Sequence, residues 1–189
     1  LTKSQAQKLL NAPDTTTLKG KRDQALLAVL LGCGLRRQEA VNLRHDRIQQ
    51  REARWVIVDL VGKRNKVRTV PMASWVKVAL DIWTQAVGII EGRIFRSFRK
   101  GDHLDGDRMT SQAVWEVVTH YAGQLGFENL APHDLRRTYA KLAHKGGAAI
   151  EQISLNLGHS SIQVTEDYLG VDLDLVDSPS DRLGLRLDG

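Results

Sequence analysis

The chain has 189 residues, of which 42% are hydrophobic and 26% charged, the balance typical of a soluble globular protein with one domain or a tight pair of lobes. No apolar run approaches the roughly 18 residues that a membrane span needs, and the single cysteine, Cys33, excludes an internal disulfide framework. No signal-peptide pattern follows Leu1, so we expect a cytoplasmic protein in which Cys33 is a small buried side chain.

Charge is distributed unevenly along the chain. The first 100 residues contain 20 Lys and Arg against 8 Asp and Glu, whereas the remaining 89 contain 7 against 14, for a net charge of +5. A basic half of this strength favours a polyanionic partner, and nucleic acid is the default candidate. An ordinary solvated surface explains the same charge equally well, so charge alone does not separate the two.

The first half of the sequence predicts helices followed by a β-hairpin. Thr2 and Gln5 have the spacing of a capping box, which opens a short helix ending at Leu10. Two strand-like segments, 55–58 and 67–70, flank Gly62-Lys63-Arg64-Asn65, the expected turn of a hairpin with a basic tip. The remaining expectations for this half are a loop over 11–20, a helix through the leucines of 26–31, and a helix over about 37–43.

The second half predicts further helices separated by glycine, proline and polar turns. Ser74 is the expected N-cap of a helix that carries one apolar face, made of Trp75, Val78, Ala79, Ile82, Trp83 and Ala86. A helix should begin at Pro132 and end at Gly146-Gly147, and the last elements should be helices over 150–157, ended by Gly158, and 161–169. Between them we expect a short strand at 94–95, a polar loop over 99–107 and a helix capped by Thr110 or Ser111. The predicted fold class is therefore α+β, mostly helical, with a small antiparallel β-sheet.

Four segments place strong hydrogen-bond donors or a nucleophile at turns and helix starts. They are Gly34-Leu35-Arg36-Arg37-Gln38-Glu39, the hairpin tip at Lys63, His133-Asp134-Leu135-Arg136, and Leu157-Gly158-His159 followed nine residues later by Tyr168. Taken singly, each has an ordinary structural explanation, such as a surface arginine, an exposed polar pair on a helix, a capping histidine or a core tyrosine.

As a set and in this order, these segments resemble the tyrosine recombinase (phage integrase) family, whose signature is an arginine, a hairpin lysine, His-x-x-Arg, a second histidine and a tyrosine. The resemblance extends over about residues 20–170, and no signature position is missing. It implies a site-specific DNA recombinase that cleaves and rejoins strands through a 3′-phosphotyrosine. It also implies the catalytic-domain fold of that family over 1–170 and a tail, 171–189, that exchanges between protomers or is disordered. We expect the family's N-terminal core-binding domain to be absent from this chain.

The resemblance further implies a role for each matching residue. The expected catalytic residues are Arg36, Lys63, His133, Arg136, His159 and Tyr168, with Glu39 orienting the active-site arginine and Arg37, Arg64, Lys66 and Arg137 contacting DNA. Side-chain chemistry supports these roles, because arginine forks donate paired hydrogen bonds to phosphate oxygens and a tyrosine with a pKa near ~10 needs help to lose its proton. By family analogy His133 takes or positions that proton, and Lys63 protonates the leaving 5′-oxygen.

Other chemistries lack a matching motif. The chain has no His-Glu-x-x-His, no cysteine–histidine cluster and no Gly-x-x-x-x-Gly-Lys-Ser/Thr loop, so we expect no metal and no cofactor. Residues 102–107 hint at a calcium loop, but Leu104 replaces a ligand and the segment is better interpreted as a turn. The expected partner is double-stranded DNA, bound by a homotetramer on two DNA sites, with a monomer or weak oligomer without DNA and no membrane contact. A type IB topoisomerase, a non-catalytic DNA-binding protein on the same scaffold and a helical interaction module remain as alternatives.

Overall fold

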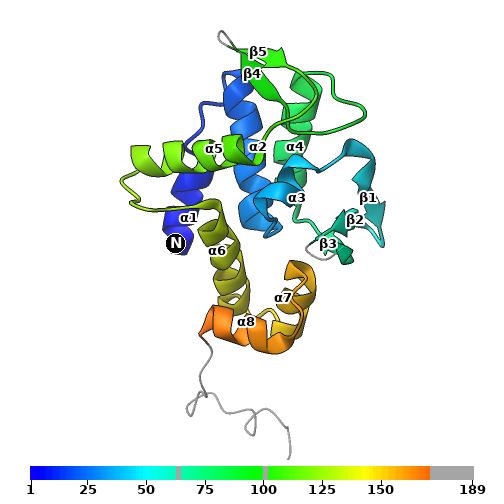
Figure 1. The fold of residues 1–189 in the computed structure, drawn as a ribbon, viewed down its shortest axis with the longest axis vertical. Helices are drawn as coiled ribbons and strands as arrows, with labels where there is room; N and C mark the ends of the chain where they lie inside the picture. Colours follow the sequence, from blue (N-terminus) through cyan, green and yellow to red (C-terminus); the bar gives the residue numbers. More distant parts are fainter. Residues whose placement is uncertain (63–64, 100–101, 171–189) are drawn as a thin grey trace, which may run out of the picture.

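Helix α2 (Leu18–Gly32) runs through the middle of the structure, and the other helices and two small sheets lie around it (Figure 1). The computed structural model describes residues 1–62, 65–99 and 102–170. Residues 25–30 of α2 are all fully buried, as expected of a helix that is apolar on every side. The other elements in the described part of the chain are α1 (Lys3–Leu10), α3 (Arg37–Val41), the 3-10 helix η1 (His45–Arg47), β1 (Ile48–Arg51), β2 (Arg54–Val61), β3 (Val67–Pro71), α4 (Ser74–Ala86), β4 (Ser97–Arg99), β5 (His103–Asp105), α5 (Ser111–Gln124), α6 (Pro132–Lys145), α7 (Ile150–Leu157) and α8 (Ile162–Leu169).

Local signals in the sequence set the ends of most helices. The capping box of α1, the Thr110 cap of α5, the proline start of α6 and the glycine ends of α6 and α7 are confirmed. The prediction for Ser74 was wrong, because α4 begins at this residue and Ala73 before it supplies no side-chain cap. Across the described residues, no helix has the length and apolar character needed to cross a membrane.

The start of α2 lies inside the predicted 11–20 loop and is held from a distant segment. The carboxylate of Asp102 accepts hydrogen bonds from the backbone N–H groups of Leu18 and Lys19, both at 2.9 Å. A carboxylate at this end is favourable because the helix dipole leaves partial positive charge there. Asp102, the first residue of the segment that hinted at a calcium loop, therefore caps the start of α2.

The three-stranded antiparallel sheet has the order β1-β2-β3, and its β2–β3 pair is the predicted hairpin. The register shifts between Ile57 and Leu60, where Asp59 has a φ of +48°. Beyond the end of β2, Gly62 N donates to Lys66 O at 2.8 Å. Strand β1 was not predicted, because its sequence is polar and mostly exposed.

The second sheet, β4–β5, corrects two predictions for the middle of the chain. Ile94 and Phe95 are fully buried but form no strand, and β4 begins two residues later. Strand β5 occupies part of the predicted 99–107 loop and pairs antiparallel with β4. Apolar side chains at 94–95 are typical of buried residues, but burial alone does not distinguish a strand from a packed loop.

Helix α4 buries a different face from the one predicted. Trp75, Val78 and Ile82 were expected in the core, yet they are 43, 55 and 44% exposed. The buried side chains are Val76, Ala79, Leu80, Trp83 and Thr84. Both stripes keep helical spacing, so periodicity does not choose between them. The hydrogen bond from Trp83 Nε1 to Ile94 O at 2.9 Å holds that indole inward, but Trp83 belongs to both stripes and does not choose between them.

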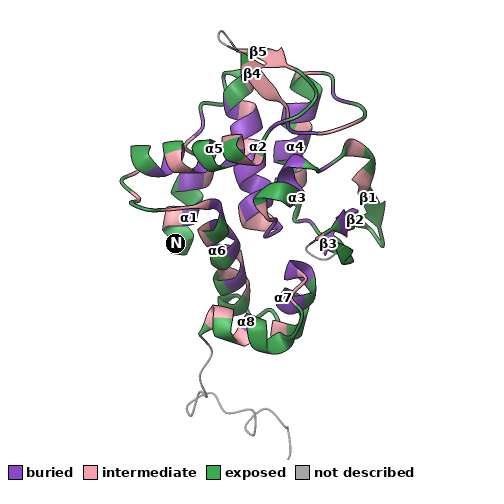
Figure 2. Ribbon diagram, in the orientation of Figure 1, coloured by how far each residue is buried: buried purple, intermediate pink, exposed green. Residues whose placement is uncertain are grey.

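The last three helices form a smaller hydrophobic cluster beside the main core. Ala140 of α6 packs with Ile153 and Leu157 of α7, and Tyr168 and Leu169 of α8 lie partly buried against them. Figure 2 shows the resulting contrast between the buried α2 and the largely exposed α8. Helix α8 therefore depends on α6 and α7 for its position.

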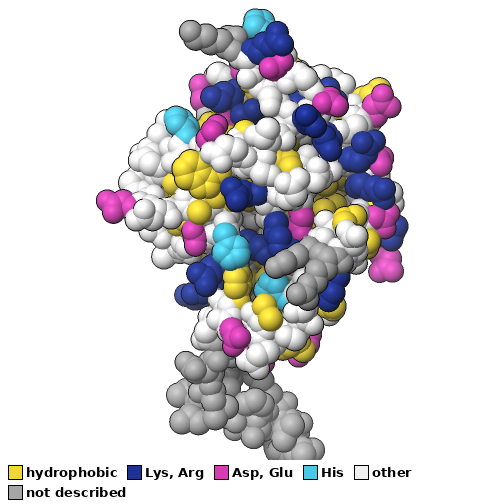
Figure 3. All heavy atoms as spheres, in the orientation of Figure 1, with side chains coloured by type: hydrophobic (Ala, Val, Ile, Leu, Met, Phe, Trp, Pro, Cys, Tyr) yellow, Lys and Arg dark blue, Asp and Glu magenta, His cyan; other side chains and the backbone are white. Residues whose placement is uncertain are grey.

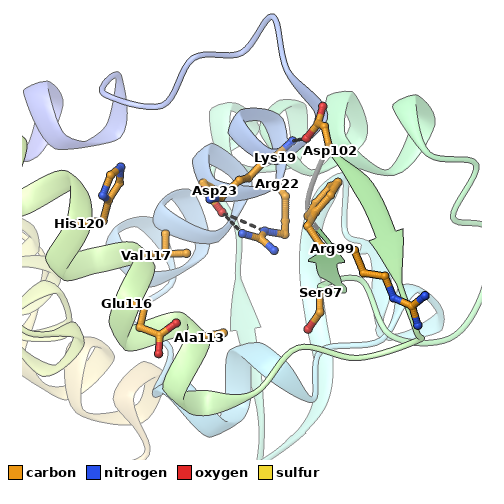
Figure 4. A pocket seen from close by; sticks show the side chains of 11 residues that line it. Lys19, Arg22, Asp23, Ser97, Arg99, Asp102, Ala113, Glu116, Val117 and His120 are labelled. Atoms are coloured by element: carbon orange, nitrogen blue, oxygen red, sulfur yellow. Dashed lines mark hydrogen bonds and ion pairs between the residues drawn. The ribbon is translucent and has the colours of Figure 1, made fainter.

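A buried ion pair within α2 is hydrogen-bonded to Tyr121 of α5. Arg22 and Asp23 are 5% and 1% exposed, and Arg22 Nε and Nη2 donate to Asp23 Oδ1 at 2.9 and 2.6 Å. Tyr121 Oη donates to the other carboxylate oxygen at 3.1 Å, and burial with the nearby carboxylate raises the pKa of this hydroxyl. The pair lines a cavity of about 540 Å³ (Figure 4).

Asp23→Ala should lower the free energy of unfolding by about 3–5 kcal/mol, because Arg22 would stay buried without its counter-charge. Tyr121→Phe should cost only about 1 kcal/mol, since it removes one neutral donor and leaves the ion pair intact. Urea unfolding followed by circular dichroism measures both. Equal losses for the two variants would show that the charge pair is not the stabilising feature.

Candidate active site

Arg36 lies at the turn between α2 and α3. Gly34 has a φ of +63°, a region that favours glycine, and it redirects the chain after α2. The Arg36 side chain is 33% exposed. Glu39 accepts hydrogen bonds from the backbone N–H and from Nη1 of Arg36, each at 2.8 Å. Through these two bonds the Glu39 carboxylate can set the direction of Arg36.

Glu39 has a second arginine partner that the sequence analysis missed. Arg68 of β3 donates from Nη1 to Glu39 Oε1 at 2.9 Å and from Nη2 to Oε2 at 3.0 Å. Burial by itself raises the pKa of Glu39, but the hydrogen bonds and charges of Arg68 and Arg36 outweigh it and hold that pKa below its usual value. The signal available in the sequence was an arginine inside a predicted strand, next to a basic turn.

Arg136 is the most deeply buried charge of the site. It is 1% exposed, and its Nη1 donates to Gly34 O at 2.6 Å while Nη2 donates to Leu157 O. Glu39 Oε2 is 4.0 Å from Nη1. Burial, followed by the charge of Arg36, lowers the pKa of Arg136 to about 10, which still leaves it charged at neutral pH.

Tyr168 lies between two histidines. Its hydroxyl is 3.4 Å from Nε2 of His133, which stands in the first turn of α6. Its ring makes edge contacts with the imidazoles of His133 and His159, at centroid distances of 5.6 and 5.4 Å. His159 follows Gly158, whose φ of +62° ends α7, and its Nδ1 is 2.9 Å from the hydroxyl of the buried Thr165.

The electrostatics of these groups set the protonation states of Tyr168 and its two histidine neighbours. Burial raises the pKa of Tyr168, although Arg136, Arg137 and Arg36 oppose the shift. Burial and the neighbouring arginines lower the pKa of His159 to about 4, and similar causes lower that of His133. At neutral pH the tyrosine is therefore protonated while both histidines are neutral. His133 has a ring nitrogen free to accept a proton, although the raised pKa of Tyr168 and the lowered pKa of His133 by themselves make the transfer between them less favourable.

The structure brings six predicted site residues into one region, namely Arg36, Glu39, His133, Arg136, His159 and Tyr168. Figure 3 shows histidine and Lys or Arg side chains side by side near the start of α6. Arg37 and Lys66 are exposed, and the guanidinium of Arg137 lies 5.2 Å from the Tyr168 ring centroid. Lys63 and Arg64 lie outside the described residues. Within the described ranges, no group of three or more His, Cys, Asp or Glu could hold a metal ion.

Two arginines next to a tyrosine that is flanked by histidines form a site able to bind a phosphate group and attack it with a hydroxyl. The chain belongs to the phage integrase family, whose model matches residues 1–173.

Cys33, expected to be buried, is fully buried in this fold, and burial raises the pKa of its thiol to about 12.

The curated relatives are tyrosine recombinases. The tyrosine recombinase XerD of Pseudomonas putida is 33% identical over 178 residues, which cover 90% of this chain and 57% of that protein. The tyrosine recombinase XerC of Herpetosiphon aurantiacus is 32% identical over 180 residues, which cover 92% of this chain and 56% of that protein. The chain thus spans little more than half the length of these relatives.

Solved structures share the fold. The crystal structure of the XerA recombinase has a TM-score of 0.72 and 23% identity, covering 91% of this chain and 60% of that one. The XerH site-specific recombinase, in a post-cleavage complex with its palindromic difH substrate, has a TM-score of 0.75 and 20% identity, covering 91% and 49%. The predicted fold class, a mostly helical tyrosine recombinase catalytic domain with small antiparallel sheets, is confirmed.

His159 should make the protein less stable in acid. Its pKa is about 4 in the folded protein against an ordinary value of 6.5, so the unfolded chain binds more protons between these values. The stabilising contribution is complete above pH 6.5 and is lost as the pH falls towards 4. Urea unfolding across this range should show the loss, and His159→Gln should reduce it. An NMR titration of His159 with a midpoint at pH 6 or above would contradict this assignment.

Proposed function

We propose that this chain is the catalytic domain of a site-specific DNA recombinase, which cleaves and rejoins DNA strands through a 3′-phosphotyrosine at Tyr168. The observation that carries the proposal is the position of the Tyr168 hydroxyl beside His133, with His159 and Arg137 against the same ring. Membership in the phage integrase family supports it. Recombination of this kind serves DNA integration, excision or resolution.

Each step of the reaction has a candidate group. Arg36 and Arg136, with His159 as a further donor, neutralise the charge that builds on the non-bridging oxygens of the phosphate. Tyr168 Oη attacks phosphorus and passes its proton to His133. The bond from phosphorus to the 5′-oxygen breaks, and Lys63 supplies the proton that this leaving oxygen needs. Rejoining is the same sequence in reverse, with a 5′-hydroxyl attacking the phosphotyrosine.

The proposed partner is double-stranded DNA. The Tn1549 transposon integrase was solved in complex with circular intermediate DNA, and the XerH site-specific recombinase with its difH substrate, which supports a DNA partner for a chain of this fold. Arg37, Arg64, Lys66 and Arg137 are the proposed DNA contacts. We further propose a homotetramer on two DNA sites and a monomer or weak oligomer without DNA.

The chain should become covalently attached to a 3′-phosphate when incubated with a pool of nicked duplexes of randomised sequence, because a nick lets the cleaved strand escape. Denaturing electrophoresis should show a slower band, and sequencing of the captured DNA should give the preferred site. Tyr168→Phe should abolish the band, whereas Tyr121→Phe, which changes a buried tyrosine elsewhere, should retain it. An adduct that persists in Tyr168→Phe would place the nucleophile at another residue.

Lys63→Ala should slow cleavage by about 10²- to 10⁴-fold, the usual effect of removing a general acid, with little loss of DNA binding. A substrate with sulfur at the 5′-bridging position should restore most of this rate, because a thiolate leaves without protonation. Lys66→Ala should weaken binding, since it removes a phosphate contact, and should show no such rescue. Equal rescue of both variants, or none for Lys63→Ala, would remove Lys63 from the catalytic groups.

A further inference from the structure

Arg68 lies where three segments of the site meet. From β3 it reaches Glu39 of α3 with both terminal nitrogens, at 2.9 and 3.0 Å, and its Nε donates to Asn156 O of α7 at 2.7 Å. Its side chain is only 10% exposed. All three guanidinium nitrogens are therefore engaged by the protein, and the side chain points away from solvent.

Two glycines of the site leave room for this arginine. A Cβ at Gly158 would lie 3.0 Å from Arg68 Cδ, and one at Gly62 would lie 3.0 Å from Arg68 Nη1 and 3.3 Å from Glu39 Oε1. Gly158 also has a positive φ, whereas at Gly62, which has none, the constraint shown is the closeness of the Arg68 and Glu39 side chains. The turn after β2 and the turn before His159 both pack on the Arg68 side chain.

Arg68 also determines how many hydrogen-bond donors of Arg36 stay free to reach a phosphate. Glu39 shares its carboxylate between the two arginines, and Arg36 gives it only Nη1 and a backbone N–H. No hydrogen bond among the described residues uses Arg36 Nε or Nη2. If Arg68 were absent, the fork of Arg36 would be free to pair with both carboxylate oxygens, the strongest geometry for such an ion pair. Arg36 would then turn inward and lose donors that could reach a phosphate.

The hydrogen bond from Arg68 Nε to Asn156 O acts on a second part of the site, the end of α7. Asn156 is buried, and its side chain donates to Cys33 O at 3.2 Å and to Tyr139 Oη at 2.7 Å. Its carbonyl lies in the last turn of α7, just before the Gly158 turn that carries His159. The Arg68 Nε bond thus anchors the segment on which His159 depends.

We propose that Arg68 is a positioning residue for the cleavage reaction: through Glu39 it keeps Arg36 directed at the phosphate, and through Asn156 it fixes the turn that presents His159. This role rests on the proposed function. Arg68 itself does not contact the substrate. Its fork geometry is required, because a single ammonium cannot bond both carboxylate oxygens and the Asn156 carbonyl in this arrangement.

The test compares single-turnover cleavage by the wild-type chain, Arg68→Gln and Arg68→Lys on a nicked duplex recovered from the randomised pool. At saturating protein, Arg68→Gln should cleave about 10- to 100-fold more slowly, as for other side chains that orient groups in contact with a substrate. Arg68→Lys should stay several-fold below wild type although it keeps the charge. DNA binding, measured by gel mobility shift, should change little for either variant.

Arg22→Gln is the matched control, because it removes an equally buried arginine from the ion pair in the cavity of Figure 4. It should lower the unfolding midpoint and leave the cleavage rate unchanged under conditions where the variant is folded. A second substrate carries a methylphosphonate at the cleaved linkage, which replaces one non-bridging oxygen and removes the negative charge. On this substrate the loss in Arg68→Gln should largely disappear, because less charge must be neutralised.

The outcomes separate this proposal from the proposed function. No adduct with wild type would overturn the function and, with it, the role of Arg68. An active wild type with an unchanged Arg68→Gln, or with full activity in Arg68→Lys, would overturn the positioning role alone. A loss of equal size on the phosphodiester and the methylphosphonate would also overturn it, since a general structural defect affects both substrates alike.

Discussion

Arg136 is buried while it carries its charge. A buried arginine is tolerated only where oxygen atoms of the protein replace the water that hydrated it. The oxygens are the carbonyls of Gly34 and Leu157, with Glu39 nearby. The same guanidinium thus holds the backbone at two points, Gly34, two residues before Arg36, and Leu157, two residues before His159. Three segments that lie far apart in the sequence take their relative positions from this charge.

Hydrophobic packing alone would not fix the position of Tyr168. Helix α6 spans both clusters, with Leu135 in the main core and Ala140 in the smaller one. Helix α8, which carries Tyr168, buries only Thr165 fully and contacts α6 and α7. Polar contacts of α8 with its neighbours, between Tyr168 and His133 and between Thr165 and His159, add the direction that apolar contacts lack, because hydrogen bonds weaken steeply when their angles change.

Features with local causes were predictable from the sequence, whereas features with distant causes were not. The Thr2 cap, the Pro132 start and the Gly158 turn depend on residues within one turn, and each was predicted correctly. The predicted rotation of α4 was wrong because two overlapping apolar stripes share Ala79 and Trp83, and only packing against the rest of the protein decides between them. Arg68 was missed for the same kind of reason, since its partner Glu39 is 29 residues away in the sequence. Lys63 and the tail after Gly170 lie outside the described residues, so their roles stay predictions.

The packing around Arg68 also bears on how the sequence can diverge. Arg68 lies against Gly62 and Gly158, so a Cβ at either glycine would force the arginine to shift, and loss of the arginine would leave the Glu39 carboxylate with one partner fewer. The effect of a substitution at position 39, 62, 68 or 158 therefore depends on the residues at the other three. We expect related sequences to vary at these four positions together more often than at positions without such contacts.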